Sequence, residues 1–107
     1  MQRIGSVIGL KPEDREEYER IHADVWPTVL KQIAASNIRN YSIYRYGDLL
    51  FSYFEYVGSD YAADMAKMAQ DAETQRWWAI CEPMQSPVAE RADGEWWATL
   101  PELFHVD

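Results

Sequence analysis

Two strand-like runs separated only by Gly47 and Asp48 predict an antiparallel hairpin in the middle of the chain. The first run, Arg39–Tyr46, alternates its side chains between two faces, with Tyr41 on one of them. The Gly-Asp pair then supplies a turn into the second run, Leu49–Val57. Because a hairpin joins strands that are neighbours in space, this stretch requires an antiparallel sheet.

The glycines of the first expected strand indicate that another group approaches that strand closely. The other expected elements lie before and after the hairpin. They are a strand at Arg3–Leu10, a helix at Pro12–Val25, a kink at Trp26-Pro27 with helix continuing through Ala35, a helix at Tyr61–Ala69 capped by Ser59-Asp60, a helix capped within Asp71–Thr74, and a strand at Leu100–His105. This βαββαβ order predicts an α+β, ferredoxin-like fold whose helices cover one face of an antiparallel sheet.

The chain is long enough for one hydrophobic core. With 107 residues, 48% of them hydrophobic, we expect residues 1–107 to form a single domain. Five tryptophans and seven tyrosines are a large aromatic load for the surface of so small a monomer. Because exposed apolar patches usually mark interfaces, we expect a homodimer.

The net charge of the chain limits the classes of molecule that it is expected to bind. A net charge of -8 argues against nucleic-acid binding, which needs a basic surface, and against anionic membranes and substrates. A neutral small molecule is the best match. Cys81 is the single cysteine, so an internal disulfide is excluded, and no apolar run approaches the roughly 20 residues needed to span a bilayer. The first residues lack the apolar region of a signal peptide, and we expect a cytoplasmic protein.

Tyr18, His22 and Trp26 are spaced four residues apart in the first predicted helix. Side chains at this spacing lie on the same side of a helix, so Tyr18 and His22 are expected to point into one cavity with Trp26 beside them. An imidazole with an ordinary pKa of about 6.5 gives and takes protons near neutrality. The sequence therefore predicts an acid/base pair with an aromatic wall, and the alternative is an ordinary core or interface.

Trp77 and Trp78 are adjacent in another predicted helix, so their indoles point about 100° apart. One is expected to pack inward while the other lines a cleft. Flat apolar rings with an N–H at the edge suit the C–H face of a pyranose and a hydroxyl beside it. Simple core packing is the alternative for this pair.

Other chemically active side chains do not suggest a metal or redox cofactor. The two histidines, His22 and His105, are far apart and lack a Cys or carboxylate at a recognisable ligand spacing, so we expect neither metal nor cofactor. His105 is expected at a strand edge, bonded to backbone or to a partner subunit. Cys81 is expected to be a small core residue. The irregular segment Glu82–Trp97, with its Trp pair, is expected to cover the open sheet face or a partner subunit.

Four motifs spread over the whole chain give it a specific pattern. They are Tyr-x-x-x-His-x-x-x-Trp-Pro at Tyr18, His22, Trp26 and Pro27, Asn-Tyr-Ser-Ile at Asn40–Ile43, the Trp77-Trp78 pair, and Leu-Phe-His-Val-Asp at Leu103–Asp107. With these motifs the chain resembles the L-rhamnose mutarotase family, small dimeric ferredoxin-like proteins of the α/β barrel type that interconvert the α and β anomers of a free sugar.

The resemblance implies roles for five side chains. His22 matches the family's proton donor, and the residues that match its sugar contacts are Tyr18, Tyr41, Trp77 and Trp78. Two segments depart from the family pattern: Thr28 replaces an acidic residue after Trp-Pro, and Glu82–Pro87 replaces an Asn-Pro-Asp-Asn-Ser-Pro-like loop, with extra residues at Gly94–Trp97. These departures favour testing L-fucose or another 6-deoxy sugar beside L-rhamnose.

The chemistry of mutarotation agrees with the residues. Opening and reclosing a sugar ring needs paired proton transfer and no nucleophile, metal or redox group, and general acid/base help is worth about 10² to 10⁴-fold. We assign His22 as the principal acid/base. Tyr18 and Tyr41 are expected to orient hydroxyls, with Tyr18 as a weaker second proton carrier and Asn40 as a further polar contact.

Two other classes of function remain open, because a fold does not decide function. The first is a cofactor-free monooxygenase or lactone isomerase with the same architecture, which would use His22 as a base in a nearly all-apolar pocket. The second is a non-catalytic sugar-binding dimer, which would bind a 6-deoxy sugar without accelerating any reaction. The polarity of the pocket separates the oxygenase from a sugar enzyme.

Overall fold

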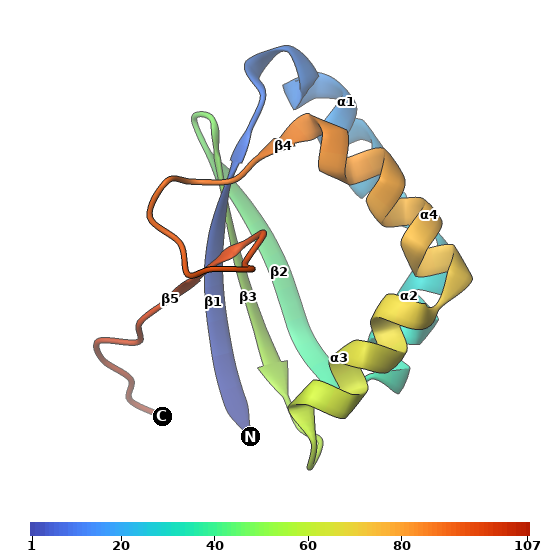
Figure 1. Ribbon diagram of the computed structural model, residues 1–107, viewed down its shortest axis with the longest axis vertical. Coiled ribbons are helices and arrows are strands. Elements are labelled where there is room, and N and C mark those ends of the chain that lie inside the picture. The colour runs from blue at the N-terminus through green and yellow to red at the C-terminus, as the bar shows by residue number, and fades with distance from the viewer.

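An antiparallel sheet forms one layer of the molecule, and the helices cover one of its faces (Figure 1). The computed structural model describes residues 1–107. The strands are β1 (Gln2–Leu10), β2 (Ile38–Tyr46), β3 (Leu49–Tyr56), β4 (Gln85–Ser86) and β5 (Ala98–Leu100). The helices are α1 (Arg15–His22), α2 (Pro27–Ala35), α3 (Tyr61–Gln70) and α4 (Ala72–Cys81), with 3-10 turns at Pro12–Asp14 and Glu82–Met84. The predicted α+β class with an antiparallel sheet is confirmed.

Strand β1 lies inside the sheet and pairs on both of its edges. The order is β2-β3-β1-β4, β5 also pairs with β1, and every pairing is antiparallel. One edge of β1 is taken by β3, and the other is divided between β5 at Gly5–Val7 and β4 at Gly9–Leu10. A Cβ atom at Gly9 would clash with the carbonyl oxygen of Ser86. The close approach predicted from the glycines of this strand is therefore found where β4 pairs.

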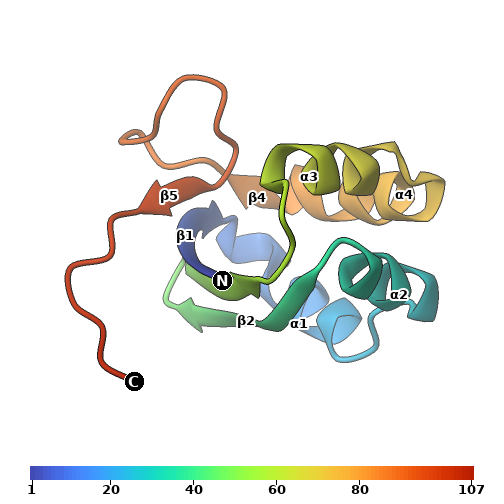
Figure 2. The same cartoon turned by 90° about the horizontal axis from the view of Figure 1, so that it is seen from below.

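The helices form two rows over the sheet (Figure 2). Helices α3 and α4 follow one another in one row, α1 and α2 lie in the other, and α2 packs against α4. Asp60 and Asp71 cap α3 and α4, as predicted, by accepting hydrogen bonds from the N–H groups of Ala63 (3.1 Å) and Thr74 (2.9 Å). No helix is long and apolar enough to cross a lipid bilayer.

The first predicted helix is interrupted more strongly than expected. Instead of one helix over Pro12–Val25, the chain makes a 3-10 turn and then α1, which ends at His22. Trp26 is extended, with ψ of 133°, because the residue before a proline disfavours the helical region. The predicted kink at Trp26-Pro27 is thus a break of four residues, and α2 then ends at Ala35 as expected.

The predicted last strand, Leu100–His105, is wrong. Strand β5 covers only Ala98–Leu100, and residues 101–107 have no regular structure. Pro101 has no N–H to continue the ladder, and Phe104 is 81% exposed, so the apolar run is not a buried strand. His105 consequently does not sit at a strand edge, and its Nε2 contacts the Asp107 carboxylate at 2.7 Å rather than a backbone group.

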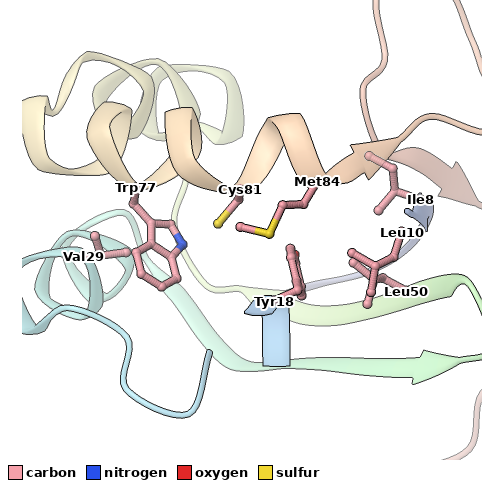
Figure 3. Close-up of a cluster of buried hydrophobic side chains, with 8 residues drawn as sticks. All are labelled: Ile8, Leu10, Tyr18, Val29, Leu50, Trp77, Cys81 and Met84. Atoms are coloured by element: carbon pink, nitrogen blue, oxygen red, sulfur yellow. The ribbon is translucent and has the colours of Figure 1, made fainter. Parts of the chain in front are cut away.

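The core lies between the sheet and three of the helices. Its eight buried side chains are Ile8, Leu10, Tyr18, Val29, Leu50, Trp77, Cys81 and Met84 (Figure 3). In Figure 3, Trp77, Cys81 and Met84 project from α4 and the turn after it into the interior, where Trp77 lies beside Val29 and Met84 lies nearer Tyr18. Cys81 is 4% exposed, as expected for a small core residue. The core therefore includes Tyr18 and Trp77, two of the side chains predicted to serve the site.

Candidate active site

A cavity of about 300 Å³ lies where α1, β2, α4 and the segment after α4 meet. This volume is at the lower end of the range for small-molecule sites, about 300 to 1,000 Å³. All five predicted site residues line it: Tyr18, His22, Tyr41, Trp77 and Trp78. The other lining residues are Ile43, Cys81, Glu82, Gln85, Trp96 and Trp97. We call this cavity the cleft.

A second cavity, of about 360 Å³, adjoins the cleft and shares part of its wall. The shared residues are His22, Tyr41, Ile43, Trp77 and Trp78. The rest of its lining is mostly aliphatic and comes from Val25, Val29, Leu30, Ile33, Met68 and Thr74. We call it the apolar lobe. The polar side chains of Tyr18, Glu82 and Gln85 belong to the cleft alone, so the two cavities differ in chemistry.

His22 and Tyr18 line the cleft together from α1. One helical turn separates them in α1, and their rings stack with centroids 4.1 Å apart and planes 22° apart. The Nδ1 of His22 lies 2.8 Å from the backbone oxygen of Tyr18. A carbonyl oxygen only accepts, so Nδ1 carries the proton, and the neutral imidazole holds its lone pair on Nε2.

The surroundings of His22 keep the imidazole neutral. Burial lowers its pKa below the ordinary value, an effect that the hydrogen bond to the Tyr18 carbonyl opposes. The Nε2 atom has no partner within the protein, and no polar side-chain atom is buried without one. Nε2 is therefore open to solvent, and near neutral pH it is an unprotonated base.

The phenol of Tyr18 is held by a neighbour from β4. Tyr18 is 3% exposed, and its hydroxyl oxygen accepts a hydrogen bond from Gln85 Nε2 at 3.0 Å. Burial raises the pKa of this phenol, so it stays protonated at every physiological pH. The Oε1 of Gln85 accepts in turn from the indole Nε1 of Trp96 at 2.7 Å. Tyr18 is therefore a hydrogen-bond donor of poor acidity.

Tyr41 reaches the cleft from a β-bulge in β2. The register with β3 shifts between Arg39 and Ser42, and Asn40 takes a positive φ of 51° there. Although 41% of the Tyr41 surface is exposed, the loss of water around its hydroxyl raises its pKa to about 12, so this phenol is also protonated. Asn40, expected as a further polar contact, does not line the cleft, and its side chain donates to Glu55 Oε1 at 2.7 Å.

The two indoles of α4 both face the cleft. Trp77 is 7% exposed, and its ring meets the His22 imidazole edge to face at a centroid distance of 5.2 Å. Trp78 is half-buried beside it. The predicted division, with one indole inward and one in a cleft, holds only in part, since Trp77 does both. Trp26 was predicted to lie beside the cavity of Tyr18 and His22. Its ring instead packs on Trp77 at a centroid distance of 5.3 Å, and it does not line the cleft.

Sequence reasoning missed the contribution of Gln85, Trp96 and Trp97 to the cleft. The pairing of β4 with β1 brings Gln85 to Tyr18. The loop after β4 turns back toward the sheet (Figure 1), and its two indoles line the cleft. The segment was expected to cover the sheet face or a partner. Its two adjacent tryptophans were the available signal, since a solvated loop does not need them.

The cleft has few charged side chains and few side chains that could bind a metal ion. Glu82 is the single carboxylate in its lining, and Cys81 has its pKa raised to about 12 by burial. No group of three or more His, Cys, Asp or Glu side chains is placed to hold a metal ion. The arrangement thus presents an open imidazole nitrogen, two phenols, an amide and four indoles around one space.

Known proteins resemble this chain over its full length. A sequence model of L-rhamnose mutarotase matches residues 3–106. An L-rhamnose mutarotase of Listeria monocytogenes is 33% identical, with 99% of each chain covered, and one of Bacillus subtilis is 30% identical, with 100% of each covered. Among solved structures, an L-rhamnose mutarotase from Formosa agariphila has a TM-score of 0.77 at 18% identity, with 100% of both chains covered. Tetracenomycin F2 cyclase from Streptomyces glaucescens has a TM-score of 0.70 at 16% identity, also over 100% of both chains, a likeness of fold alone.

Proposed function

Because the chain belongs to the L-rhamnose mutarotase family, we propose that its cleft interconverts the α and β anomers of L-rhamnose by general acid/base ring opening and closure. The chain is accordingly an isomerase that acts on carbohydrates. One observation carries the mechanism: the open Nε2 of a neutral His22 lies beside the protonated phenol of Tyr18 in a cleft walled by indoles. L-Fucose, another 6-deoxy sugar, is the alternative substrate.

His22 acts first as a base and then as an acid. Its Nε2 takes the proton of the anomeric hydroxyl while the C1–O1 double bond forms and the C1–O5 bond breaks. The imidazolium then gives that proton to O5, which leaves an open-chain aldehyde and a neutral imidazole. One nitrogen can serve both oxygens because both are attached to C1. After rotation about C1–C2, the same steps in reverse close the ring as the other anomer.

The two phenols hold the sugar and do not carry the proton. Tyr18 and Tyr41 both have a raised pKa and keep their protons, so each donates a hydrogen bond to a sugar oxygen. A donor near C1 also stabilises the negative charge that develops on O5 during opening. Their task in this proposal is orientation and electrostatic stabilisation.

The walls of the two cavities support a 6-deoxy sugar. The rings of Trp77 and Trp78 offer flat surfaces to its C–H groups. The aliphatic lining of the apolar lobe, next to the shared wall, suits the C6 methyl group, which replaces the hydroxymethyl group of an ordinary hexose. The same lobe alone would suit an aromatic substrate, but a monooxygenase pocket would not need the phenols, the amide and the carboxylate of the cleft.

Anomeric exchange measured by saturation-transfer NMR tests the proposal directly. Wild-type protein is expected to accelerate exchange in L-rhamnose, and His22→Asn is expected to lose that acceleration. The matched control is His105→Asn, which changes the other histidine in the exposed tail and is expected to keep full activity. A wild-type protein that binds the sugar without accelerating exchange would indicate the sugar-binding dimer, and L-fucose measured in parallel ranks the substrates.

The remaining expectations from the sequence stay proposals. We propose that residues 1–107 form one domain, that the protein is cytoplasmic, and that two copies associate. Exposed aromatic side chains such as Tyr44 and Tyr46, at 65% and 79% exposure, support association. Light scattering after size exclusion would give the mass in solution, and the mass of a monomer, 12.5 kDa, would contradict the dimer.

A further inference from the structure

Three side chains form a row of hydrogen bonds that leads from Trp96, in the loop after β4, through Gln85 in β4 to Tyr18 in α1. The indole N–H of Trp96 donates to Gln85 Oε1 at 2.7 Å, and the Gln85 amide nitrogen donates to the Tyr18 hydroxyl oxygen at 3.0 Å. Gln85 and Tyr18 are 7% and 3% exposed, so water has little access to these two members. Trp96 is the outermost member, with 43% of its surface exposed.

The row has one possible direction, and Trp96 sets it. An indole N–H only donates, so the oxygen of the Gln85 amide must face Trp96. The amide NH₂ must then face Tyr18, which obliges the phenol oxygen to accept. The Tyr18 proton consequently points away from Gln85, and no acceptor in the protein takes it.

We propose that Trp96 is a positioning residue, which fixes the orientation of the Gln85 amide and thereby aims the O–H of Tyr18 into the cleft toward a sugar oxygen. This inference rests on the proposed function, because the acceptor for that proton is the substrate.

Without the Trp96 indole, no other group in the row fixes the orientation of the Gln85 amide. Gln85 then rotates by half a turn, presents its oxygen to Tyr18 and accepts the phenol proton itself. The two amide orientations have almost the same shape, so this change leaves the packing intact while the donor is withdrawn from the cleft. Trp96 therefore acts on the reaction through Tyr18.

A double-mutant cycle tests that route. We expect Trp96→Phe, which keeps an aromatic ring and removes the N–H, to lower kcat/KM for L-rhamnose exchange by about tenfold, the effect of one misdirected hydrogen bond. In the Tyr18→Phe background the same change is expected to cost less than about twofold, because the proton that it redirects is gone. Equal losses in both backgrounds would overturn the inference.

The cycle separates failure of this inference from failure of the proposed function. A wild-type protein that does not accelerate exchange would contradict the proposed function. A Tyr18→Phe variant with wild-type activity would contradict the role of the phenol. In either case the Tyr18 hydroxyl does not donate to a substrate, so the proposed role of Trp96 would be contradicted as well. Equal losses in both backgrounds, with an active wild type and a weakened Tyr18→Phe, would remove the role of Trp96 and leave the enzyme as proposed.

Gln85→Glu adds a pH signature that a merely structural role would not produce. A protonated carboxyl group donates to Tyr18 and accepts from Trp96, as the amide does, whereas a carboxylate accepts from both and captures the Tyr18 proton. The activity of Gln85→Glu relative to wild type is therefore expected to fall as pH rises through the pKa of the new carboxyl group. Gln85→Met, which has no polar atom to titrate, is the control and should keep a constant ratio.

The ratio to wild type removes the shared titrations except where the new carboxylate shifts them, and a His22 pKa raised by that charge would make the ratio rise with pH, opposite to the expected fall. The titratable groups facing position 85 in the cleft are Tyr18, His22, Tyr41, Cys81 and Glu82, and all of them are present in both proteins. Circular dichroism at each pH would verify that the variants are folded. A constant ratio for a folded Gln85→Glu would overturn the inference.

Discussion

The Nδ1–H of His22 donates to the backbone carbonyl of Tyr18, one helical turn earlier, over 2.8 Å. This bond decides which nitrogen of the imidazole carries the proton and leaves Nε2 as the free base. It also ties the ring to the backbone of α1, so that the base and the Tyr18 phenol are oriented by the same helical turn.

The tautomer is the first testable consequence. We expect ¹⁵N NMR of the imidazole at neutral pH to show His22 with a protonated Nδ1 and an unprotonated Nε2. His22→Asn identifies the signal by its disappearance. A spectrum with the proton on Nε2 would contradict the geometry and the assignment of that nitrogen as the base.

The lowered pKa of His22 determines the pH dependence of catalysis. The active form is the neutral base, so kcat/KM should be constant at neutral pH and fall only as the pH is lowered through the pKa of the folded protein. Burial holds this pKa below the ordinary value of 6.5, so half of the activity should be lost below pH 6.5. The rate of the uncatalysed reaction in each buffer is subtracted. A midpoint above pH 6.5 would show that burial does not dominate.

Substitution of His22 and of Tyr18, whose rings stack, should separate an effect on turnover from an effect on sugar binding. His22→Ala is expected to lower kcat by about 10² to 10⁴-fold, because it removes the base. Tyr18→Phe is expected to raise KM by about tenfold with a smaller change in kcat, because it removes a hydrogen bond that holds the sugar.

A tyrosine outside the cleft is the control for this pair. Tyr53→Phe removes a phenol that donates to Glu55 at 2.7 Å and should leave both constants unchanged. Small and equal effects of His22→Ala and Tyr18→Phe on kcat and KM would count against the two assigned roles.

Gly9 should be intolerant of a side chain, whereas Gly5 in the same strand should accept one. A Cβ at Gly9 would clash with the Ser86 carbonyl, and we expect Gly9→Ala to lower the free energy of unfolding by about 1 to 3 kcal/mol. At Gly5 the nearest atom would lie at 3.8 Å, an ordinary contact, so Gly5→Ala should be close to neutral. Urea denaturation measures both, and similar losses would refute the role of β4 pairing.

Cys81 should be unreactive while the protein is folded. Its pKa of about 12 leaves only about 10⁻⁴ of the thiol ionised at pH 8, and the thiolate is the reactive form. A disulfide reagent such as DTNB is expected to modify the protein within minutes in urea and far more slowly without it, with Cys81→Ser as the blank. Rapid modification of the folded protein would show that the thiol is ionised or open.

Local rules were sufficient for most of the elements. The turn at Gly47-Asp48 and the caps at Asp60 and Asp71 depend on residues within one turn of the chain, and all three were predicted correctly. The stacking of Tyr18 and His22 follows in the same way from helical spacing. The last strand was mispredicted because an apolar run is not sufficient for a strand when a proline interrupts its hydrogen bonds.

The sequence by itself determined the order of the elements from β1 to α4, the antiparallel sheet, and five of the side chains that line the cleft, since these depend on periodicity, turn chemistry and recognisable motifs. Only the tertiary structure decided that Gln85 lies against Tyr18, 67 residues away, and that the Trp96 loop returns to the same cleft. It also decided that Asn40 turns to Glu55. These contacts join segments whose positions follow from the pairing of β4 with β1 and from core packing, and neither is encoded in the spacing of neighbouring residues.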